Sequence, residues 1–182
     1  MNSEHPKPAD EHGGAAKSIV CRPRLLVTLF SGGFYWETQR VIEGLQYDFD
    51  IRFVTLSGVA SQKLWPALAP YCFYVASYDF RRRSWIRNLG SLMRATWQKY
   101  AILRNGRFDG ALGVGVNLSV PLAIAAKLRG LPFVFVESVS RVTRPSLTGR
   151  LLSLLNATDR LYVQWPEATR MYRKARYEGS VL

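Results

Sequence analysis

Two polar segments in the last third of the chain carry the side chains best suited to chemistry. Glu137 and Arg141 follow the apolar run 133–136, and the segment 164–167 follows the run 161–163. Both runs are short and rich in β-branched and aromatic residues, which predicts strands buried on both faces. Ligands of open α/β sheets bind outside the carboxyl ends of the strands, so we expect both segments at a binding edge.

Glu137 is the candidate for acid–base work. A carboxylate at the end of a strand can orient a sugar hydroxyl or act as a general base. The alternatives are an ion pair with Arg141 and a cap on the following turn. The position at the expected binding edge favours the functional interpretation, and Arg141 can serve both as a partner and in the site.

The second segment reads Gln164-Trp165-Pro166-Glu167. Proline at the first helical position and glutamate in the first turn are typical of a helix start. This interpretation explains Pro166 and Glu167. It does not explain an adjacent glutamine and tryptophan at the end of a strand.

Ser31-Gly32-Gly33 lies between an expected strand and an expected helix. Free backbone N–H groups and the helix dipole favour an anion there, and glycines allow it close approach. The alternative is a tight turn that requires glycine, and the pattern alone leaves both open. Two glycines fall short of the dinucleotide fingerprint, and the second expected strand does not end in an acid, so NAD is not expected.

Gly113, Gly115 and Asn117 follow the same logic at the end of the fourth expected strand. Small residues there allow a ligand to approach the backbone. The alternative is a close crossing between the strand and the next helix, and the pattern favours this alternative slightly.

Arg81, Arg82 and Arg83 stand just ahead of Trp85 and Arg87, where a long helix is expected to begin. Basic residues near an anionic leaflet contribute roughly 1 kcal/mol each, and tryptophan suits the membrane interface. The alternative is a solvated basic loop, which the pattern alone favours.

Composition limits the possible partners and cofactors. The chain has 182 residues, 48% of them hydrophobic, and a formal net charge of +12, which favours an anionic partner. No nucleic-acid-binding module appears, so no nucleic-acid partner is expected. Cys21 and Cys72 lack metal-ligand spacing and suggest two unpaired thiols in a reducing compartment, while His5 and His12 lie in the polar N-terminal segment. We expect no metal, no signal peptide, no transmembrane helix and a cytosolic protein.

Strand and helix patterns alternate along the chain, with no hairpin signal. This alternation predicts an α/β fold with a doubly wound parallel sheet and helices on both faces. Residues 1–22 are expected to be a disordered polar tail and 23–182 a single domain. Expected strands cover 24–30, 51–55, 71–75, 110–114, 133–136 and 161–163, and expected helices cover 34–45, 61–68, 84–104, 118–129, 146–156 and 167–174.

Three segments in this order resemble a known family. They are Val136-Glu137-Ser138-Val139-Ser140-Arg141, Ser146-Leu147-Thr148-Gly149-Arg150-Leu151-Leu152 and Val163-Gln164-Trp165-Pro166-Glu167. They resemble the membrane-recruiting subunit of the two-chain N-acetylglucosaminyltransferase of dolichol-linked glycan synthesis, and its bacterial relatives, the exopolysaccharide and capsule glycosyltransferase accessory subunits. The resemblance runs from about Arg24 to Leu182 and is strongest from Gly113 onward; Tyr177-Glu178-Gly179 also resembles the end of that family.

The resemblance implies a Rossmann-like domain corresponding to the N-terminal, acceptor-side half of a GT-B glycosyltransferase. A separate small subunit would bind the UDP-sugar donor, and this chain would need no cofactor. Its partners would be that subunit, an anionic membrane surface and a polyprenyl-diphosphate-linked acceptor. The resemblance also raises the membrane interpretation of the Arg81–Arg87 segment above the solvated loop.

Roles for single residues follow from the same resemblance. Ser31, Gly32 and Gly33 would hold the lipid diphosphate or face the reaction centre, Glu137 and Arg141 would line the cleft, and residues 164–167 would form the cleft rim or partner interface. The chain departs from the family where Phe34 follows the glycine turn, since the family usually has a histidine there. It also has a polar tail where eukaryotic members carry a membrane anchor, which indicates a bacterial-type peripheral protein on the inner face of the plasma membrane.

Two hypotheses remain. In one, the chain is the acceptor-binding subunit of a split UDP-sugar transferase that is inactive alone and acts in polysaccharide biosynthesis. In the other, it is a scaffold that recruits the donor-binding partner to the membrane and takes no part in the chemistry.

Overall fold

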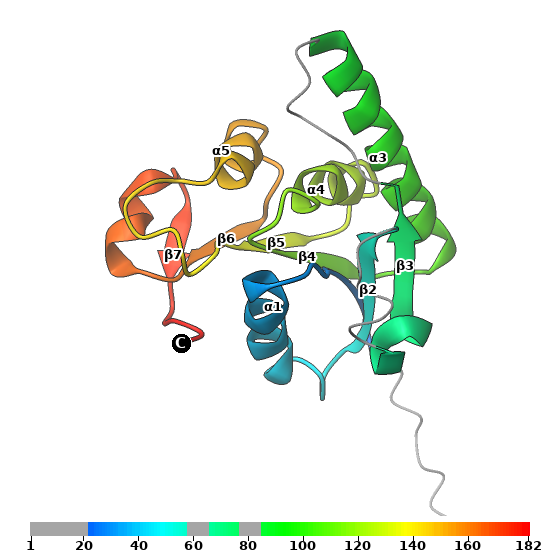
Figure 1. Cartoon of the computed structure of the whole chain (residues 1–182), viewed down its shortest axis with the longest axis horizontal. Coiled ribbons are helices and arrows are strands. Elements are labelled where there is room, and N and C mark those ends of the chain that lie inside the picture. The colour runs from blue at the N-terminus through cyan, green and yellow to red at the C-terminus, as the bar shows by residue number, and fades with distance from the viewer. Residues whose placement is uncertain (1–21, 58–65, 77–84) are drawn as a thin grey trace, which may run out of the picture.

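A computed structural model describes residues 22–57, 66–76 and 85–182 (Figure 1). Seven parallel strands form one sheet in the order β3-β2-β1-β4-β5-β6-β7. The strands are β1 (Arg24–Thr28), β2 (Asp50–Leu56), β3 (Cys72–Val75), β4 (Gly110–Val114), β5 (Phe133–Val136), β6 (Arg160–Val163) and β7 (Ala175–Tyr177).

Helices cover both faces of this sheet. Figure 1 shows α1 on one face and α3, α4 and α5 on the other. Their bounds are α1 (Gly33–Glu43), α3 (Trp85–Asn105), α4 (Ser119–Leu128) and α5 (Leu147–Leu154), and two 3-10 helices, η1 (Pro66–Tyr71) and η2 (Pro166–Met171), complete the order. The doubly wound Rossmann-like α/β fold predicted from the alternating pattern is confirmed.

The core consists of two layers that follow the alternation of side chains along each strand. Leu26 faces the layer under α3, α4 and α5, and its neighbour Val27 faces the layer under α1. All five residues of the central strand β4 are buried because helices cover it on both sides. The near-continuous apolar run at 110–114 therefore predicted this strand correctly.

The C-terminal end differs from the sequence expectation. The helix expected over 167–174 is the shorter η2, and β7 follows it as an edge strand that was not predicted. An edge strand pairs on one side only, and Arg176 and Tyr177 are exposed, so no apolar run marks it. The helix expected over 146–156 ends at Leu154, and Asn156 adopts a left-handed φ of 45° just after it.

Several expectations fall on residues outside the described ranges. These are the disordered tail, His5, His12, Cys21, the start of the helix expected over 61–68, and Arg81 to Arg83. Cys72 is a free, half-buried thiol whose pKa burial raises. Within the described ranges, no helix has both the length and the apolar character to cross a membrane.

The sheet has its topological switch point between β1 and β4. The chain leaves β1 towards β2 on one side and later returns to β4 on the other, so the connections after these two strands run in opposite directions. Ligands of such sheets bind in the crevice that this divergence leaves at the carboxyl ends.

Candidate functional site

Three segments meet at the switch point: the start of α1, the turn after β4 and the loop after β5. Gly115 follows β4 and has φ of +60°. A Cβ atom at this position would lie 2.8 Å from the Phe34 ring and 3.0 Å from the Cβ of Ser138. Only glycine meets both the backbone conformation and the close packing here.

Phe34 occupies the position where the resemblance led us to expect histidine. Its ring packs edge-to-face against Phe30, with centroids 6.3 Å apart, and it also covers Gly115. An apolar ring therefore packs beside the switch point at the position where histidine was expected.

The glycine turn has the conformation that the tight-turn interpretation requires. Gly32 is the N-cap residue of α1 with φ of 70°, a conformation that favours glycine. It has no side chain to cap the helix, and Gly32 and Gly33 are exposed while Ser31 is half-buried. The start of α1 at Gly32 and Gly33 is therefore accessible, while the Tyr35 N–H already donates to the Gly32 carbonyl at 3.0 Å.

Gly113 has a different role from Gly115. It lies inside buried β4, and a Cβ atom there would overlap the Ser119 side chain of α4. The structure therefore supports the close strand-to-helix crossing at Gly113 rather than a ligand contact. Asn117, at the start of the next helix, is exposed at the carboxyl edge.

Glu137 is buried, with 1% of its surface exposed. The Ser146 hydroxyl donates to its Oε2 at 2.7 Å, the Tyr172 hydroxyl donates to the same oxygen, and the Ser138 N–H donates to its Oε1 at 3.0 Å. Protein donors thus engage both oxygens, which favours the capping interpretation over a base open to substrate. Among the described residues no ion pair joins Glu137 to Arg141.

This network around Glu137 joins three elements of the C-terminal half. Ser146 is the N-cap residue of α5 and its Oγ accepts from the Gly149 N–H at 2.9 Å. The Ser146 N–H donates to the Tyr172 hydroxyl at 2.9 Å. Burial, with the neighbouring Glu137 carboxylate, raises the pKa of Tyr172. The network therefore fixes the loop after β5 against α5 and the end of η2.

Glu37 is the acid that sequence reasoning missed. It lies in α1, is 4% exposed, and accepts hydrogen bonds from Ser138 Oγ at 2.8 Å and from the Val139 N–H at 3.4 Å. The available signal was spacing: Phe34, Glu37, Thr38 and Val41 fall on one face of the expected helix, so two polar residues stand in an otherwise apolar stripe.

The segment after β6 lies against the loop after β5, as the shared edge predicted. Trp165 Nε1 donates to the Val139 carbonyl at 2.7 Å. Gln164 is buried, and its Oε1 accepts from the Val181 N–H at 3.0 Å, which holds the C-terminal end. Pro166 and Glu167 are exposed and start η2, in agreement with the helix-start interpretation.

Comparison with known proteins adds the family. The family model described as oligosaccharide biosynthesis protein Alg14 like matches residues 81–181, more than half of the chain. The chain belongs to the Alg14-like family.

Curated relatives agree with this assignment. The UDP-N-acetylglucosamine transferase subunit ALG14 of Rattus norvegicus is 30% identical over 107 residues, which cover 56% of this chain and 49% of that protein. The subunit alg14 of Schizosaccharomyces pombe is 29% identical over 195 residues, covering 92% and 89%. The chain thus spans about half the length of the mammalian relatives that it matches and most of the fission yeast one.

Solved structures show the same fold at low identity. MurG of Acinetobacter baumannii, a GT-B glycosyltransferase, superposes with a TM-score of 0.68 at 15% identity, over 85% of this chain and 45% of that chain. UDP-N-acetylglucosamine 2-epimerase of Rickettsia bellii gives a TM-score of 0.63 at 14% identity, over 88% and 45%. The fold that this chain shares with each of these proteins thus covers less than half of that protein.

The part matched to the Alg14-like family contains the Glu137 network and residues 164–167. Residues 31–33 and Glu37 precede the matched range, but the fold brings Glu37 against Ser138 in the loop after β5. One site is thus assembled from both parts of the chain.

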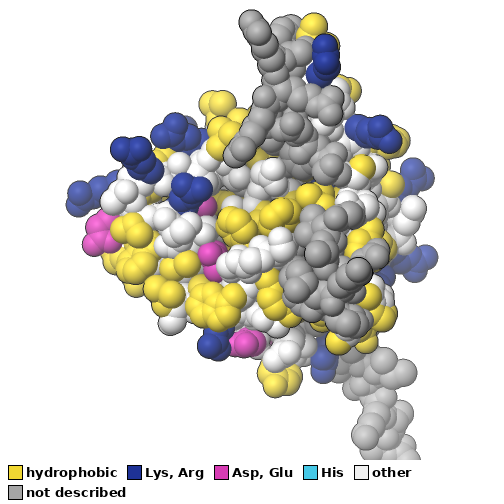
Figure 2. All heavy atoms as spheres, in the orientation of Figure 1, with side chains coloured by type: hydrophobic (Ala, Val, Ile, Leu, Met, Phe, Trp, Pro, Cys, Tyr) yellow, Lys and Arg dark blue, Asp and Glu magenta, His cyan; other side chains and the backbone are white. Residues whose placement is uncertain are grey.

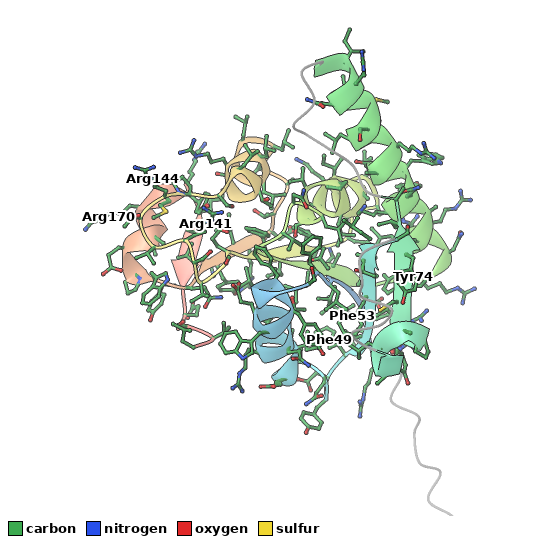
Figure 3. The ribbon with its side chains drawn as sticks, viewed as in Figure 1. Phe49, Phe53, Tyr74, Arg141, Arg144 and Arg170 are labelled. Atoms are coloured by element: carbon green, nitrogen blue, oxygen red, sulfur yellow. The ribbon has the colours of Figure 1, made fainter. Side chains whose placement is uncertain are left out.

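Exposed arginines lie at this end of the molecule. Arg141, Arg144 and Arg170 are exposed, and Figure 3 shows them near η2 and the loop after β5. In Figure 2 the Lys and Arg side chains visible in this view lie mainly over that side and along α3. On α3, Arg87 is exposed.

Proposed function

We propose that this chain is the acceptor-binding, membrane-associated subunit of a heteromeric glycosyltransferase. The enzyme would move a sugar from a UDP-sugar to a polyprenyl-diphosphate-linked saccharide in polysaccharide biosynthesis. The observation that carries the proposal is the convergence of the start of α1, the turn after β4 and the loop after β5 at the switch point of a Rossmann-like fold in an Alg14-like chain. The relatives are named as subunits of a UDP-N-acetylglucosamine transferase, which supports a split enzyme.

The diphosphate of the acceptor would bind at the start of α1. Gly32 and Gly33 are exposed there, no side chain caps the helix, and the helix dipole favours an anion. Arg141, exposed on the loop after β5, would add a positive charge to this edge of the sheet. A separate donor-binding subunit would bring the UDP-sugar to the same edge, with residues 164–167 at the rim or interface.

The membrane contact would extend along α3. Ile86, Leu89, Met93 and Trp97 are 65%, 48%, 65% and 71% exposed, and their spacing places them on one side of the helix. We call these four residues the α3 stripe. Figure 1 shows the start of α3 reaching beyond the other helices. An exposed apolar stripe with arginines beside it suits the anionic inner face of a plasma membrane.

A second candidate is a scaffold that recruits the donor-binding subunit without taking part in the chemistry. The burial of Glu137 favours this candidate, because the carboxylate expected to act as the base is engaged by protein donors.

Sugar transfer from labelled UDP-sugars to membrane lipid extracts tests both candidates. The assay is run with this chain alone, with its small donor-binding partner alone, and with the two mixed. We expect transfer only in the mixture. Transfer by the partner alone, merely increased by this chain, would support the scaffold. No transfer in any arm, with a folded partner that binds UDP, would contradict the proposed function.

A further inference from the structure

A chain of hydrogen bonds leads from the protein surface to a buried carboxylate at the switch point. Ser140 is exposed, whereas Ser138 and Glu37 are 3% and 4% exposed. The hydroxyl oxygens of Ser140 and Ser138 lie 3.0 Å apart, and Ser138 Oγ donates to Glu37 Oε1 at 2.8 Å. We call these three residues the serine–glutamate relay.

The relay has a direction. A serine hydroxyl has a single proton to donate, and the proton of Ser138 is directed at Glu37. The Ser140 hydroxyl must therefore be the donor in the pair of serines, and the Ser140 N–H donates to Ser138 Oγ as well, at 3.3 Å. Each hydroxyl in the relay thus points its proton towards the carboxylate.

The surroundings of Glu37 suit a proton acceptor. Burial raises the pKa of Glu37, the hydrogen bonds from Ser138 and Val139 oppose this rise, and the nearby charge of Glu137 adds to it. Strand β4, which packs against α1, has no ionisable side chain, and Arg24 at the far end of β1 pairs with Asp50. Within the described ranges, Glu137 is the charged group that acts on Glu37.

The relay also lies where the acceptor would bind. Ser138 packs against Gly115, so the relay runs beside the crevice between β1 and β4. Trp165 Nε1 donates to the Val139 carbonyl, and the Ser138 N–H donates to Glu137. These two hydrogen bonds fix the loop in place. The relay contributes to the Glu137 network through the backbone N–H of Ser138, which a change of the Glu37, Ser138 or Ser140 side chain leaves in place.

We propose that Glu37 receives, through Ser138 and Ser140, the proton that the acceptor hydroxyl loses during sugar transfer; this inference rests on the proposed function. The acceptor oxygen forms a bond to the anomeric carbon while the bond from that carbon to the UDP oxygen breaks. UDP leaves with the electron pair. The acceptor proton passes to Ser140, the Ser140 proton to Ser138, and the Ser138 proton to the Glu37 carboxylate.

Glu37→Gln tests the relay in the active two-chain mixture. Glutamine still accepts from Ser138 and Val139 but cannot take a proton. We expect kcat to fall about 100-fold, the contribution of a general base, and the acidic limb of the pH profile to disappear. Thr38→Val, a buried change at the next position on α1, should keep the wild-type rate and profile.

Ser140→Ala is a second test, in case Glu37→Gln folds poorly. Because Ser140 is exposed, its replacement should not disturb folding. We expect at least about a tenfold loss of kcat, and a double variant no slower than Glu37→Gln, since both act in one path. A wild-type rate and pH profile in either single variant would overturn the relay. Absence of transfer by the wild-type mixture would instead contradict the proposed function.

A second measurement needs no activity. In the partner-free chain, carboxyl NMR should show Glu37 titrating above the ordinary glutamate range, and still higher in Ser138→Ala, because the Ser138 bond favours the ionised form. An ordinary titration that Ser138→Ala leaves unchanged would overturn the proposal.

Discussion

The Tyr172 hydroxyl donates a hydrogen bond to the buried carboxylate of Glu137, across 35 positions of the chain. This contact joins the end of η2 to the end of β5. Because Ser146 donates to the same oxygen, the carboxylate is the centre of a network that shapes the loop beside the switch point.

Glu137→Gln should lower the free energy of unfolding by about 3 kcal/mol. An amide has one acceptor oxygen, whereas both oxygens of Glu137 accept hydrogen bonds, so one group of donors is left unsatisfied. Urea unfolding measures the change. Glu43→Gln, an exposed acid paired with Arg40, should change stability by less than about 0.5 kcal/mol. If the Glu137→Gln chain is fully stable but has lost sugar transfer, Glu137 takes part in the chemistry and not only in the fold.

Gly149→Ala should destabilise the fold by about 2 kcal/mol. A Cβ atom at Gly149 would lie 2.5 Å from the Tyr172 hydroxyl oxygen and 2.7 Å from Glu137 Oε2, in the middle of the network. Gly90→Ala is the matched control, since nothing lies within 4 Å of a Cβ there and alanine favours the helix by up to about 1 kcal/mol. Thermal unfolding should move in opposite directions for the two variants; equal shifts would contradict the packing.

Lys99 should make stability depend on alkaline pH. Burial lowers the pKa of Lys99 to about 8 from its ordinary 10.5. Between these values the unfolded chain holds a proton that the folded chain has released, so the free energy of unfolding should rise with pH. Urea unfolding of wild type and Lys99→Met over this window measures the effect, because the other titrating groups cancel in the difference. A difference that stays constant across the window would contradict the prediction.

The α3 stripe should bind anionic vesicles, with an affinity that salt weakens. Trp97→Glu places a charge at a 71% exposed stripe position and should lower vesicle binding about tenfold in sedimentation. Tyr47→Glu is the control, because Tyr47 is 74% exposed and lies just after α1, outside the stripe. Equal losses in the two variants would show that the added charge, and not the stripe, determines binding.

Much of the fold could be predicted because each buried parallel strand can be recognised from its own short stretch of sequence. Strands such as β4 and β5 are buried on both faces, so their apolar runs are nearly continuous. The binding edge followed from general topology, and Gly115 does pack against Phe34 at the start of α1 and Ser138 in the loop after β5. Strand β7 was missed because an edge position needs no apolar run.

The chemistry of the site was harder to predict, because it depends on contacts between distant positions. Glu137 and Glu37 look alike in sequence as acids near apolar residues. Their environments are set by Ser146 and Tyr172 in one case and by Ser138 in the other, at separations from 9 to 101 positions. No local pattern carries that information, so the sequence alone could not compare the two acids as candidates for a base.

Equilibrium binding to this chain without its partner tests the central claim most directly. A short-chain polyprenyl-diphosphate saccharide in detergent and a UDP-sugar are titrated separately against the same protein. We expect saturable binding of the polyprenyl-diphosphate saccharide, weakened by Arg141→Glu, and no binding of the UDP-sugar. Binding of the UDP-sugar but not of the saccharide would contradict the assignment of this chain to the acceptor side.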